Sequence, residues 1–334
     1  MEIAALVNIR ARRGSEAVAQ ALHDELPGAR IRVSRTLADA ESFAREVIED
    51  PPGLVLAAGG DGTAIGFINA MRANSAVGST LSPAMGVLPL GTGNGWAHAT
   101  GAHGWRSALR RLGRADRSGR KLAFRRFDLV ETCGMLGHFA GTGWDAELID
   151  DFHAQQEGFS VLPRRARIGL TGYVNGLLTK TVPRHLLKDR VEVEIVNLGE
   201  DALGVDDAGA PCAMPGGEHG KVLYRGPTSV CGAATSEEYG FRFRAYPFAQ
   251  LVRGRMNLRN YAGTAAQALW SSPGLWRGAH PLPHMSSWLV TRVRATFSRP
   301  VAFQIGGDRA GHRDTIEFAL APFAIDLLDW SKLS

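Results

Sequence analysis

The chain has 334 residues, of which 45% are hydrophobic and 21% charged, and its formal net charge is +5. This composition is typical of a folded globular protein and excludes disordered and collagen-like chains. The length suffices for two domains. No apolar stretch approaches the ~20 residues that a membrane-spanning helix needs, which excludes an integral membrane protein built on such helices.

The cysteines and the N-terminus bear on where the protein works. The three cysteines, Cys133, Cys212 and Cys231, are odd in number and widely spaced, which fits neither a disulfide framework nor a zinc site. The first residues lack the basic start, the long apolar middle and the cleavage site of a signal peptide. We therefore expect a reducing, cytoplasmic location.

The first third of the chain alternates strand and helix signals. Short apolar runs predict four strands, over residues 3–7, 31–33, 54–58 and 85–88. The segments between the first three strands carry apolar residues at helical spacing. Uninterrupted apolar runs suit parallel strands that are covered on both faces. The pattern predicts an α/β domain with an open parallel sheet and helices on both faces.

A glycine turn follows the third predicted strand. Leu54–Ala58 leads into Gly59-Gly60-Asp61-Gly62-Thr63, and a helical pattern continues over Ala64–Arg72. Glycines let the backbone approach a ligand closely, and the start of a helix favours an anion. Asp61 would face a phosphate only with a cation between them, so the turn predicts a bridging Mg²⁺. An ordinary tight turn is the alternative interpretation.

A second glycine loop, Gly91-Thr92-Gly93-Asn94, follows the fourth predicted strand. Adjacent parallel strands end at the same edge of a sheet, where ligands bind. Neither loop has the Gly-Lys-Ser/Thr of a Walker loop or the G-x-G-x-x-G of a dinucleotide-binding fold. The two loops together predict a phosphate-binding edge of another type.

The segment from Trp105 to Arg126 is strongly basic, with nine Lys or Arg residues and one acid, Asp116. Basic residues near an anionic leaflet contribute about 1 kcal/mol each to binding, although a solvated helix face has the same composition. Nucleic acid would attract the same charges. We expect no nucleic-acid partner, because no recognised binding module or interleaved aromatic pattern accompanies them.

After about Arg126 the strand signals dominate. They cover residues 127–132, 191–196, 239–246, 289–297 and 301–305. These segments predict a second domain of mostly antiparallel strands, and the glycine-, proline- and acid-rich stretch 199–219 predicts a hairpin loop. We expect one domain over residues 1–125, completed by about 316–334, and a second over 126–315.

Several of these segments resemble one family. Gly59–Thr63, Asn69 and Leu88–Asn94 resemble the catalytic domain of diacylglycerol kinases, of sphingosine and ceramide kinases, and of their soluble bacterial relatives. Further similar segments extend the resemblance over most of the chain: Phe139–Ala146, Gly172-Tyr173, Pro247–Ala249 and Gln304–Asp308. The resemblance implies a nucleotide-binding α/β domain of the NAD kinase/diacylglycerol kinase type, followed by a β-sandwich domain for the lipid substrate.

The resemblance also implies an activity. It indicates an ATP-dependent kinase that transfers the γ-phosphoryl group to a primary hydroxyl of diacylglycerol or of a sphingoid- or ceramide-type lipid, with Mg²⁺ held by Asp61. By position, the residues around the nucleotide are Thr36, Gly59, Gly60, Asp61, Gly62, Thr63, Gly91, Thr92, Gly93 and Asn94. Because such a substrate resides in the membrane, we expect reversible contact with the anionic inner surface. The oligomeric state is left open, with a homodimer among the options.

The sequence departs from the family at the catalytic acids. The family motif Asp-Gly-Glu reads Gly306-Gly307-Asp308 in this chain, so the first acid is missing. A hydroxyl nucleophile benefits from a carboxylate that accepts its proton, and Asp308 is therefore the candidate base; a plain turn residue is the alternative. In an extended strand residues 306 and 308 would share a face, unless the two glycines turn the chain. Asp145 is a candidate for binding a polar lipid headgroup or for a structural role.

Two other functions remain open. One is a non-catalytic relative that binds nucleotide or lipid and keeps the fold after losing the acid at position 306. The other is an NAD kinase, which shares the Gly-Gly-Asp-Gly signature. Those enzymes also carry an Asn-Glu pair downstream, and no Asn in this chain is followed by Glu.

Overall fold

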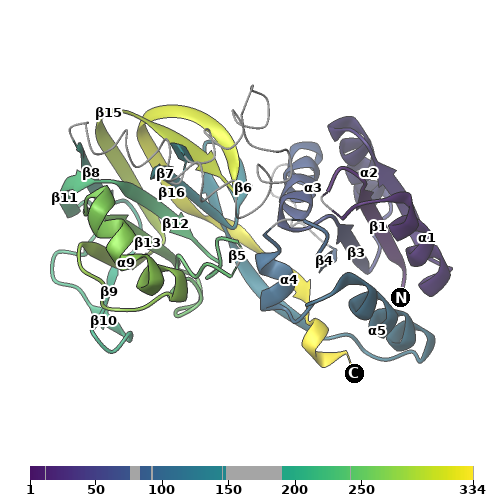
Figure 1. The fold of residues 1–334 in the computed structure, drawn as a ribbon. Coiled ribbons are helices and arrows are strands. Elements are labelled where there is room, and N and C mark those ends of the chain that lie inside the picture. Colours follow the sequence, from purple (N-terminus) through teal and green to yellow (C-terminus); the bar gives the residue numbers. More distant parts are fainter. Residues whose placement is uncertain are drawn as a thin grey trace, which may run out of the picture. The chain divides into compact units, whose positions relative to one another are not determined.

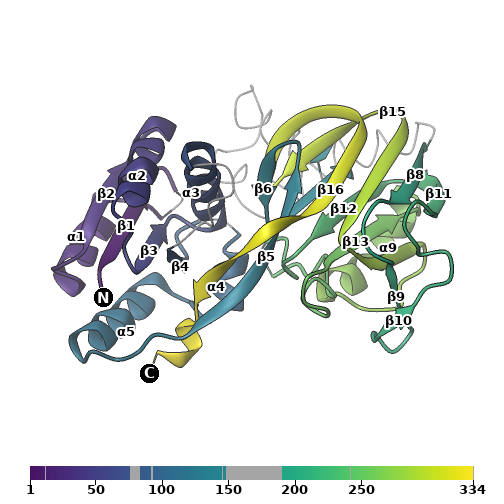
Figure 2. The same ribbon diagram turned by 180° about the vertical axis from the view of Figure 1, so that it is seen from behind.

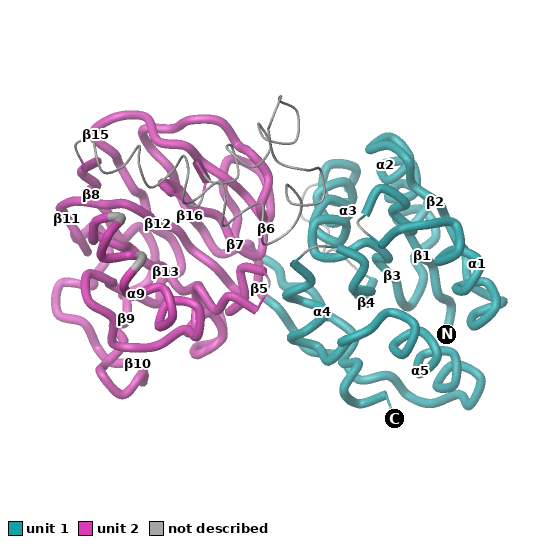
Figure 3. Tube along the Cα trace, viewed as in Figure 1, with its two compact units in different colours: residues 1–127, 322–334 teal, residues 128–321 magenta. Residues whose placement is uncertain are grey.

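The computed structural model describes residues 1–11, 13–75, 83–91, 93–144, 146–147, 190–240 and 242–333, with only the backbone at Ala265 and Leu269. The chain forms two compact units, unit 1 with residues 1–127 and 322–334 and unit 2 with residues 128–321 (Figure 3). The expected boundaries differ from these by two residues at the first junction and by six at the second.

Unit 1 contains a parallel sheet. Its strands are, in spatial order, β2 (Arg30–Ser34), β1 (Ile3–Asn8), β3 (Leu54–Ala58) and β4 (Ala84–Leu88), followed by the end of β16 (Asp308–Leu328). All neighbours on this path are parallel. The central strand β3 is buried along its whole length, which is why its sequence is uniformly apolar. The predicted parallel α/β sheet is confirmed.

Helices cover both faces of this sheet (Figure 1). On one face α2 (Leu37–Glu49) packs against α3 (Asp61–Asn74), where the rings of Phe43 and Phe67 lie 5.5 Å apart between centroids. On the other face α1 (Glu16–Glu25) contacts α5 (Trp105–Arg117), and Arg117 Nη1 donates to the carbonyl of Glu25 at 3.1 Å. The crossover from β1 to β2 through α1 and the crossover from β2 to β3 through α2 run in opposite directions along the sheet. Right-handed crossovers of opposite direction place their helices on opposite faces.

The order of the strands creates a switch point at β1. The chain moves from β1 to β2 on one side and returns to β3 on the other. The ends of the strands are level, since Val7 pairs with Ala58 and Ala58 pairs with Leu88. The loops after β1, β3 and β4 therefore leave the sheet at one edge, which is the usual ligand site of such folds.

Unit 2 is built largely of antiparallel strands. Its described strands are β6 (Met135–Gly137), β7 (Phe139–Gly143), β8 (Val191–Asn197), β9 (Leu203–Val205), β10 (Pro211–Ala213), β11 (Val222–Thr228), β12 (Val230–Ala234), β13 (Met256–Tyr261), β14 (Met285–Val290) and β15 (Arg292–Ile305), while β5 (Phe124–Thr132) and β16 run through both units. Figure 2 shows β15 and β16 as a long, curved hairpin. Its register shifts between Thr296 and Val301, and β15 also pairs with β7 and with β8.

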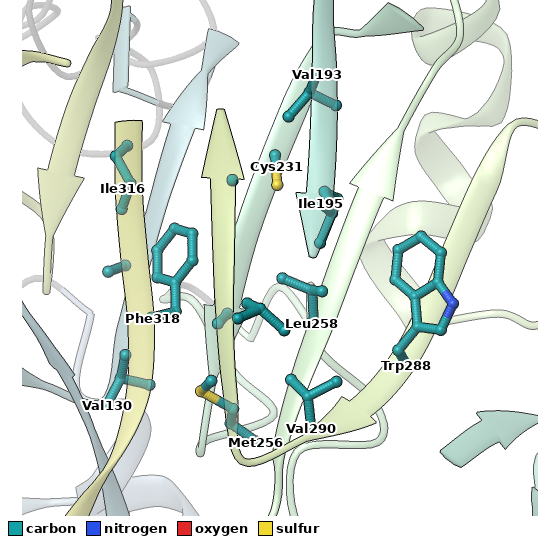
Figure 4. Close-up of a cluster of buried hydrophobic side chains, with 14 of the residues drawn as sticks. Val130, Val193, Ile195, Cys231, Met256, Leu258, Trp288, Val290, Ile316 and Phe318 are labelled. Carbon is teal, nitrogen blue, oxygen red and sulfur yellow. The ribbon is translucent and has the colours of Figure 1, made fainter. Parts of the chain in front are cut away.

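A large cluster of buried hydrophobic side chains lies among these strands (Figure 4). It combines buried side chains from several strands, such as Ile195 of β8, Leu258 of β13, Trp288 of β14 and Phe318 of β16. Along β13 the core residues are Met256 and Leu258, which is the alternation of a strand with one face on the core. The predicted antiparallel C-terminal domain is confirmed.

Some predicted elements differ from the structure. The strand predicted over 239–246 is wrong, because the described residues 239–240 and 242–246 form no strand and only one isolated bridge, between Gly240 and Phe243. Gly240 and Arg242 have φ of 139° and 63°, which an extended strand excludes. The strand predicted over 289–297 is divided between the end of β14 and the start of β15, and the strand predicted over 301–305 is the end of the same β15. The hairpin expected within 199–219 is β9–β10. Gly172-Tyr173 lie outside the described residues.

Candidate functional site

The two glycine loops contact each other at the carboxyl edge of the unit 1 sheet. Gly60 has a φ of +108°, and a Cβ added to it would lie 2.9 Å from both Asn94 Oδ1 and Gly91 Cα. A Cβ on Gly91 would lie 2.8 Å from the carbonyl oxygen of Gly59. Neighbouring backbone leaves no room for a side chain here, so the packing of one loop on the other requires these glycines.

Gly62 has a different reason to be glycine. It is the exposed second residue of α3, and a Cβ added to it would meet no atom within 4 Å. Glycine costs about 1 kcal/mol relative to alanine inside a helix, and neither backbone conformation nor packing demands it at this position. Gly66, one turn further on, has the same open surroundings. The open space beside Gly62 is where a ligand at the helix start would approach the backbone.

Asp61 joins the two loops. Its side chain is buried, and its carboxylate accepts hydrogen bonds from the amides of Gly95 (2.5 Å) and Trp96 (3.1 Å) at the start of α4 (Gly95–Ala99). Asp61 therefore has a structural role that sequence reasoning missed, since it had assigned the carboxylate to metal alone. A carboxylate has about four acceptor sites, so these two bonds are compatible with a metal-ligand role as well.

Asn94 closes the second loop on itself. It adopts the left-handed conformation, with φ of 58°, which asparagine tolerates better than most residues. Its Oδ1 accepts from Gly91 N at 3.0 Å, and its Nδ2 donates to Gly91 O at 2.9 Å. Asn94 thus shapes the loop through its side chain. Gly93 is half-buried beside it.

The first loop is also tied to the end of β1. Asn8 Nδ2 donates to Thr63 Oγ1 at 3.0 Å, which connects the last residue of β1 with the first turn of α3 across the switch point. Sequence reasoning had placed Thr63 at the nucleotide but had given Asn8 no role. A signal was available in its position, directly after the strand predicted over residues 3–7.

Thr36 lies after β2 and serves as the N-cap of α2. Its Oγ1 accepts from Asp39 N at 3.2 Å, while Asp39 Oδ2 accepts from Thr36 N at 2.8 Å. The amides of Arg35 and Thr36 hold the pKa of Asp39 below its usual value. The Thr36 hydroxyl thus has a structural partner at the same sheet edge as the glycine loops. Thr92 and Asp145, also predicted site residues, lie outside the described residues.

Asp308 follows a tight turn in unit 2. Gly306 and Gly307 form the two-residue connection between β15 and β16, with φ of 61° and 91°, and Ile305 pairs with Asp308. Two positive φ values are typical of a type I′ hairpin turn. The glycines therefore turn the chain, and residues 306 and 308 do not alternate along one strand. Asp308 is exposed at the start of β16.

The described residues contain no group of three or more His, Cys, Asp or Glu side chains that could hold a metal ion. Among them Asp61 is the carboxylate at the glycine loops. Mg²⁺ is commonly bound in proteins through one or two carboxylates together with substrate phosphates. The position of Asp61 fits a site of that kind and does not fit a metal cage made of protein groups.

Comparison with solved structures shows the fold of almost the whole chain. A protein from Bacillus anthracis str. Sterne that is named as a candidate diacylglycerol kinase superposes with a TM-score of 0.69 at 15% identity, covering 97% of this chain and 96% of that one. A second structure from the same organism, named as a diacylglycerol kinase, gives a TM-score of 0.61 at 13% identity with the same coverage. At these identities the likeness concerns the fold. Comparison with curated proteins gave no match.

The family model of the diacylglycerol kinase catalytic domain matches residues 6–122. This range holds the second half of β1, the strands β2 to β4, both glycine loops, Asp61 and Thr36. The match agrees with the fold and with the carboxyl-edge loops described above. Residues 6–122 are thus similar to the catalytic domain of diacylglycerol kinases, and this match supports a kinase domain in that part of the chain.

Proposed function

We propose that this protein is an ATP-dependent kinase that phosphorylates a hydroxyl group of a membrane lipid, either diacylglycerol or a sphingoid- or ceramide-type lipid. The observation that carries the nucleotide site is Gly62, a glycine at a helix start that neither conformation nor packing explains. Unpaired amides and the helix dipole attract phosphate at such a start. The family match supports the kinase activity.

The phosphates of ATP would lie against the loops after β3 and β4, near Gly62. Mg²⁺, when bound, would neutralise charge on the phosphate oxygens, and Asp61 would be its protein ligand. The same carboxylate accepts the amides of Gly95 and Trp96. It would therefore keep the two loops at a fixed spacing whether or not nucleotide is bound.

Asp308 is the proposed general base. The lipid hydroxyl oxygen would form a bond to the γ-phosphorus, while the bond from that phosphorus to the β,γ-bridging oxygen breaks and ADP leaves. The proton of the hydroxyl would pass to the Asp308 carboxylate. Its exposure supports this role, since a base must be accessible to its substrate.

The test is transfer of label from [γ-³²P]ATP to a panel containing diacylglycerol, sphingosine, ceramide and NAD. We expect one lipid class to be labelled, and Asp308→Asn to lower turnover by roughly 10²–10⁴-fold, the usual scale of general base catalysis. Asp314→Asn is the control, because Asp314 is also an exposed acid of β16. Labelling of NAD alone would assign the protein to NAD kinases. ATP binding with no labelled product would favour the non-catalytic alternative.

We further propose reversible contact with an anionic membrane surface through α5 and the segment after it. The apolar side of α5, including Leu109 and Leu112, is buried. The opposite side and the following residues expose eight basic side chains: Arg106, Arg110, Arg114, Arg117, Arg120, Lys121, Arg125 and Arg126. No helix among the described residues is long and apolar enough to cross a membrane, so binding would rest on the surface.

Liposome co-sedimentation tests this contact. Binding should increase with the fraction of anionic lipid and decrease as salt screens the charges. Arg114→Glu should weaken it, whereas Arg313→Glu, an exposed arginine of β16, should not. Binding to duplex DNA at the same salt concentration, with no binding to vesicles, would reassign the basic surface to nucleic acid.

A further inference from the structure

A buried glutamine stands directly before the turn that leads to Asp308. Gln304 of β15 is 0% exposed. Its Oε1 accepts from Gly307 N at 2.9 Å, and its Nε2 donates to Tyr239 Oη at 2.6 Å. The Gln304 side chain therefore binds Gly307, the second residue of the turn, and connects it to Tyr239.

Tyr239 is itself held in place by neighbours. Its ring stacks on Phe139 of β7 with 4.1 Å between centroids, and the ring of Tyr246 lies 6.3 Å away. Its amide donates to the carbonyl of Phe243 at 2.8 Å. Because β7 pairs with β15 in the sheet, the anchor rests on the same sheet that carries Gln304.

The turn needs such an anchor because both of its corner residues are glycines. Glycine has the largest backbone freedom of all residues, so a Gly306-Gly307 turn restrains the following residue weakly by itself. Two hydrogen bonds restrict it here: Gly307 N to the Gln304 side chain, and Gly306 N to the carbonyl of Phe139 at 2.9 Å. The first of these depends on a side chain and can be removed by substitution.

We propose that Gln304 and Tyr239 are positioning residues, which hold the Gly306-Gly307 turn and thereby the Asp308 carboxylate. This inference rests on the proposed function, in which Asp308 accepts the proton of the acceptor hydroxyl. Without the anchor, the carboxylate occupies the productive orientation for a smaller fraction of the time. The turnover number falls, while ATP affinity is retained because the glycine loops of unit 1 are unchanged.

Tyr239→Phe and Gln304→Met test the anchor. Phenylalanine keeps the ring stack and removes the hydroxyl, and methionine keeps the length of Gln304 and removes both hydrogen bonds. For Gln304→Met we expect kcat to fall by roughly 10–100-fold, the scale of a displaced catalytic group, with a smaller loss in Tyr239→Phe. KM for ATP should stay within about 2-fold of the wild type, because a positioning role affects the chemical step.

Matched controls separate this role from a general loss of packing. Tyr224→Phe also removes a hydroxyl hydrogen bond in unit 2, from Tyr224 Oη to the carbonyl of Pro227 at 2.8 Å, and should leave kcat unchanged. Gln250→Met replaces an exposed glutamine of unit 2 and should also be silent. Circular dichroism and melting temperatures confirm that each variant folds.

A double-variant cycle with Asp308→Asn decides the outcome. If Gln304 acts through Asp308, adding Gln304→Met to Asp308→Asn should cause little further loss of kcat. If the losses of kcat from Gln304→Met and Asp308→Asn are fully additive, the inference is overturned and the proposed function stands. The same holds if the folded anchor variants keep the wild-type kcat while Asp308→Asn is impaired. An Asp308→Asn variant with wild-type kcat would instead reject the base assignment itself, and the anchor role with it.

Discussion

Three glycine-to-alanine substitutions within seven residues should have opposite effects, because the glycines have different reasons to be there. At Gly60 the added Cβ would lie 2.9 Å from Gly91 Cα and 3.0 Å from Gly91 N, on a backbone with φ of +108°. At Gly62 and Gly66, both within α3, the added Cβ would meet nothing within 4 Å. An added methyl group would therefore clash with backbone atoms at Gly60 and would point into open space at Gly62 and Gly66.

The magnitudes follow from these surroundings. Strain at an unfavourable φ costs about 1–3 kcal/mol, and overpacking against backbone costs another ~1–3 kcal/mol. We expect Gly60→Ala to lower the free energy of unfolding by about 2–6 kcal/mol, the sum of these two effects. Gly62→Ala and Gly66→Ala should each raise it by about 0.5–1 kcal/mol, because alanine favours the helix.

Urea denaturation of the nucleotide-free protein measures these changes, since Trp96 and Trp330 are buried fluorophores of unit 1. Isothermal titration with ATP and Mg²⁺ then measures affinity. Gly62→Ala should bind ATP at least ~10-fold more weakly than the wild type, because its methyl group would occupy the ligand space, a loss of about 1.4 kcal/mol. Gly66→Ala is the matched control and should bind normally.

Two results would refute this reasoning. Wild-type ATP affinity in Gly62→Ala would mean that the open space beside this residue is not the phosphate site. Wild-type stability in Gly60→Ala would mean that the two glycine loops do not contact each other as described. A variant that is more stable and yet binds less ATP would separate function from folding at a single residue.

Further predictions concern stability. Asp61→Asn should destabilise the nucleotide-free protein by about 1–3 kcal/mol in urea titrations, because the new amide NH₂ would face a backbone N–H; Asp24→Asn, on the exposed side of α1, is the control. Arg111→Met should lower the melting temperature and speed carboxypeptidase digestion, because Arg111 donates to three backbone carbonyls, including that of Trp330 at 2.9 Å. Burial lowers the pKa of His138 from 6.5 to about 3, so the unfolded chain binds more protons between these values and the free energy of unfolding falls as pH drops through this range. In His138→Gln the free energy of unfolding should fall less as the pH drops through this range. An unchanged pH dependence of the free energy of unfolding would contradict the role of His138.

The amino-acid sequence alone was enough to predict the class of the fold and the position of the two glycine loops. Strands such as Leu54–Ala58 are buried on both faces, and burial of that kind leaves an uninterrupted apolar run that can be recognised locally. The glycine loops could be recognised for the same reason, since a turn between a strand and a helix needs its residues within one short segment. What the structure adds is the reason for three of these glycines, Gly60, Gly62 and Gly91.

The tertiary structure decided which residues hold the site together. Asp61 binds the amide of Gly95, 34 residues away, and Gln304 binds Tyr239, 65 residues away. No periodicity in the sequence records such a pair, because the two partners meet only after the sheet has brought their segments together. The strand predicted over 239–246 shows the same limit. Its aromatic residues favour a strand, but Tyr239 stacks on Phe139 of β7 and binds Gln304 of β15, and Arg242 has a positive φ. Local β-propensity could not predict this arrangement, because Phe139 and Gln304, the partners of Tyr239, lie far from it in the sequence.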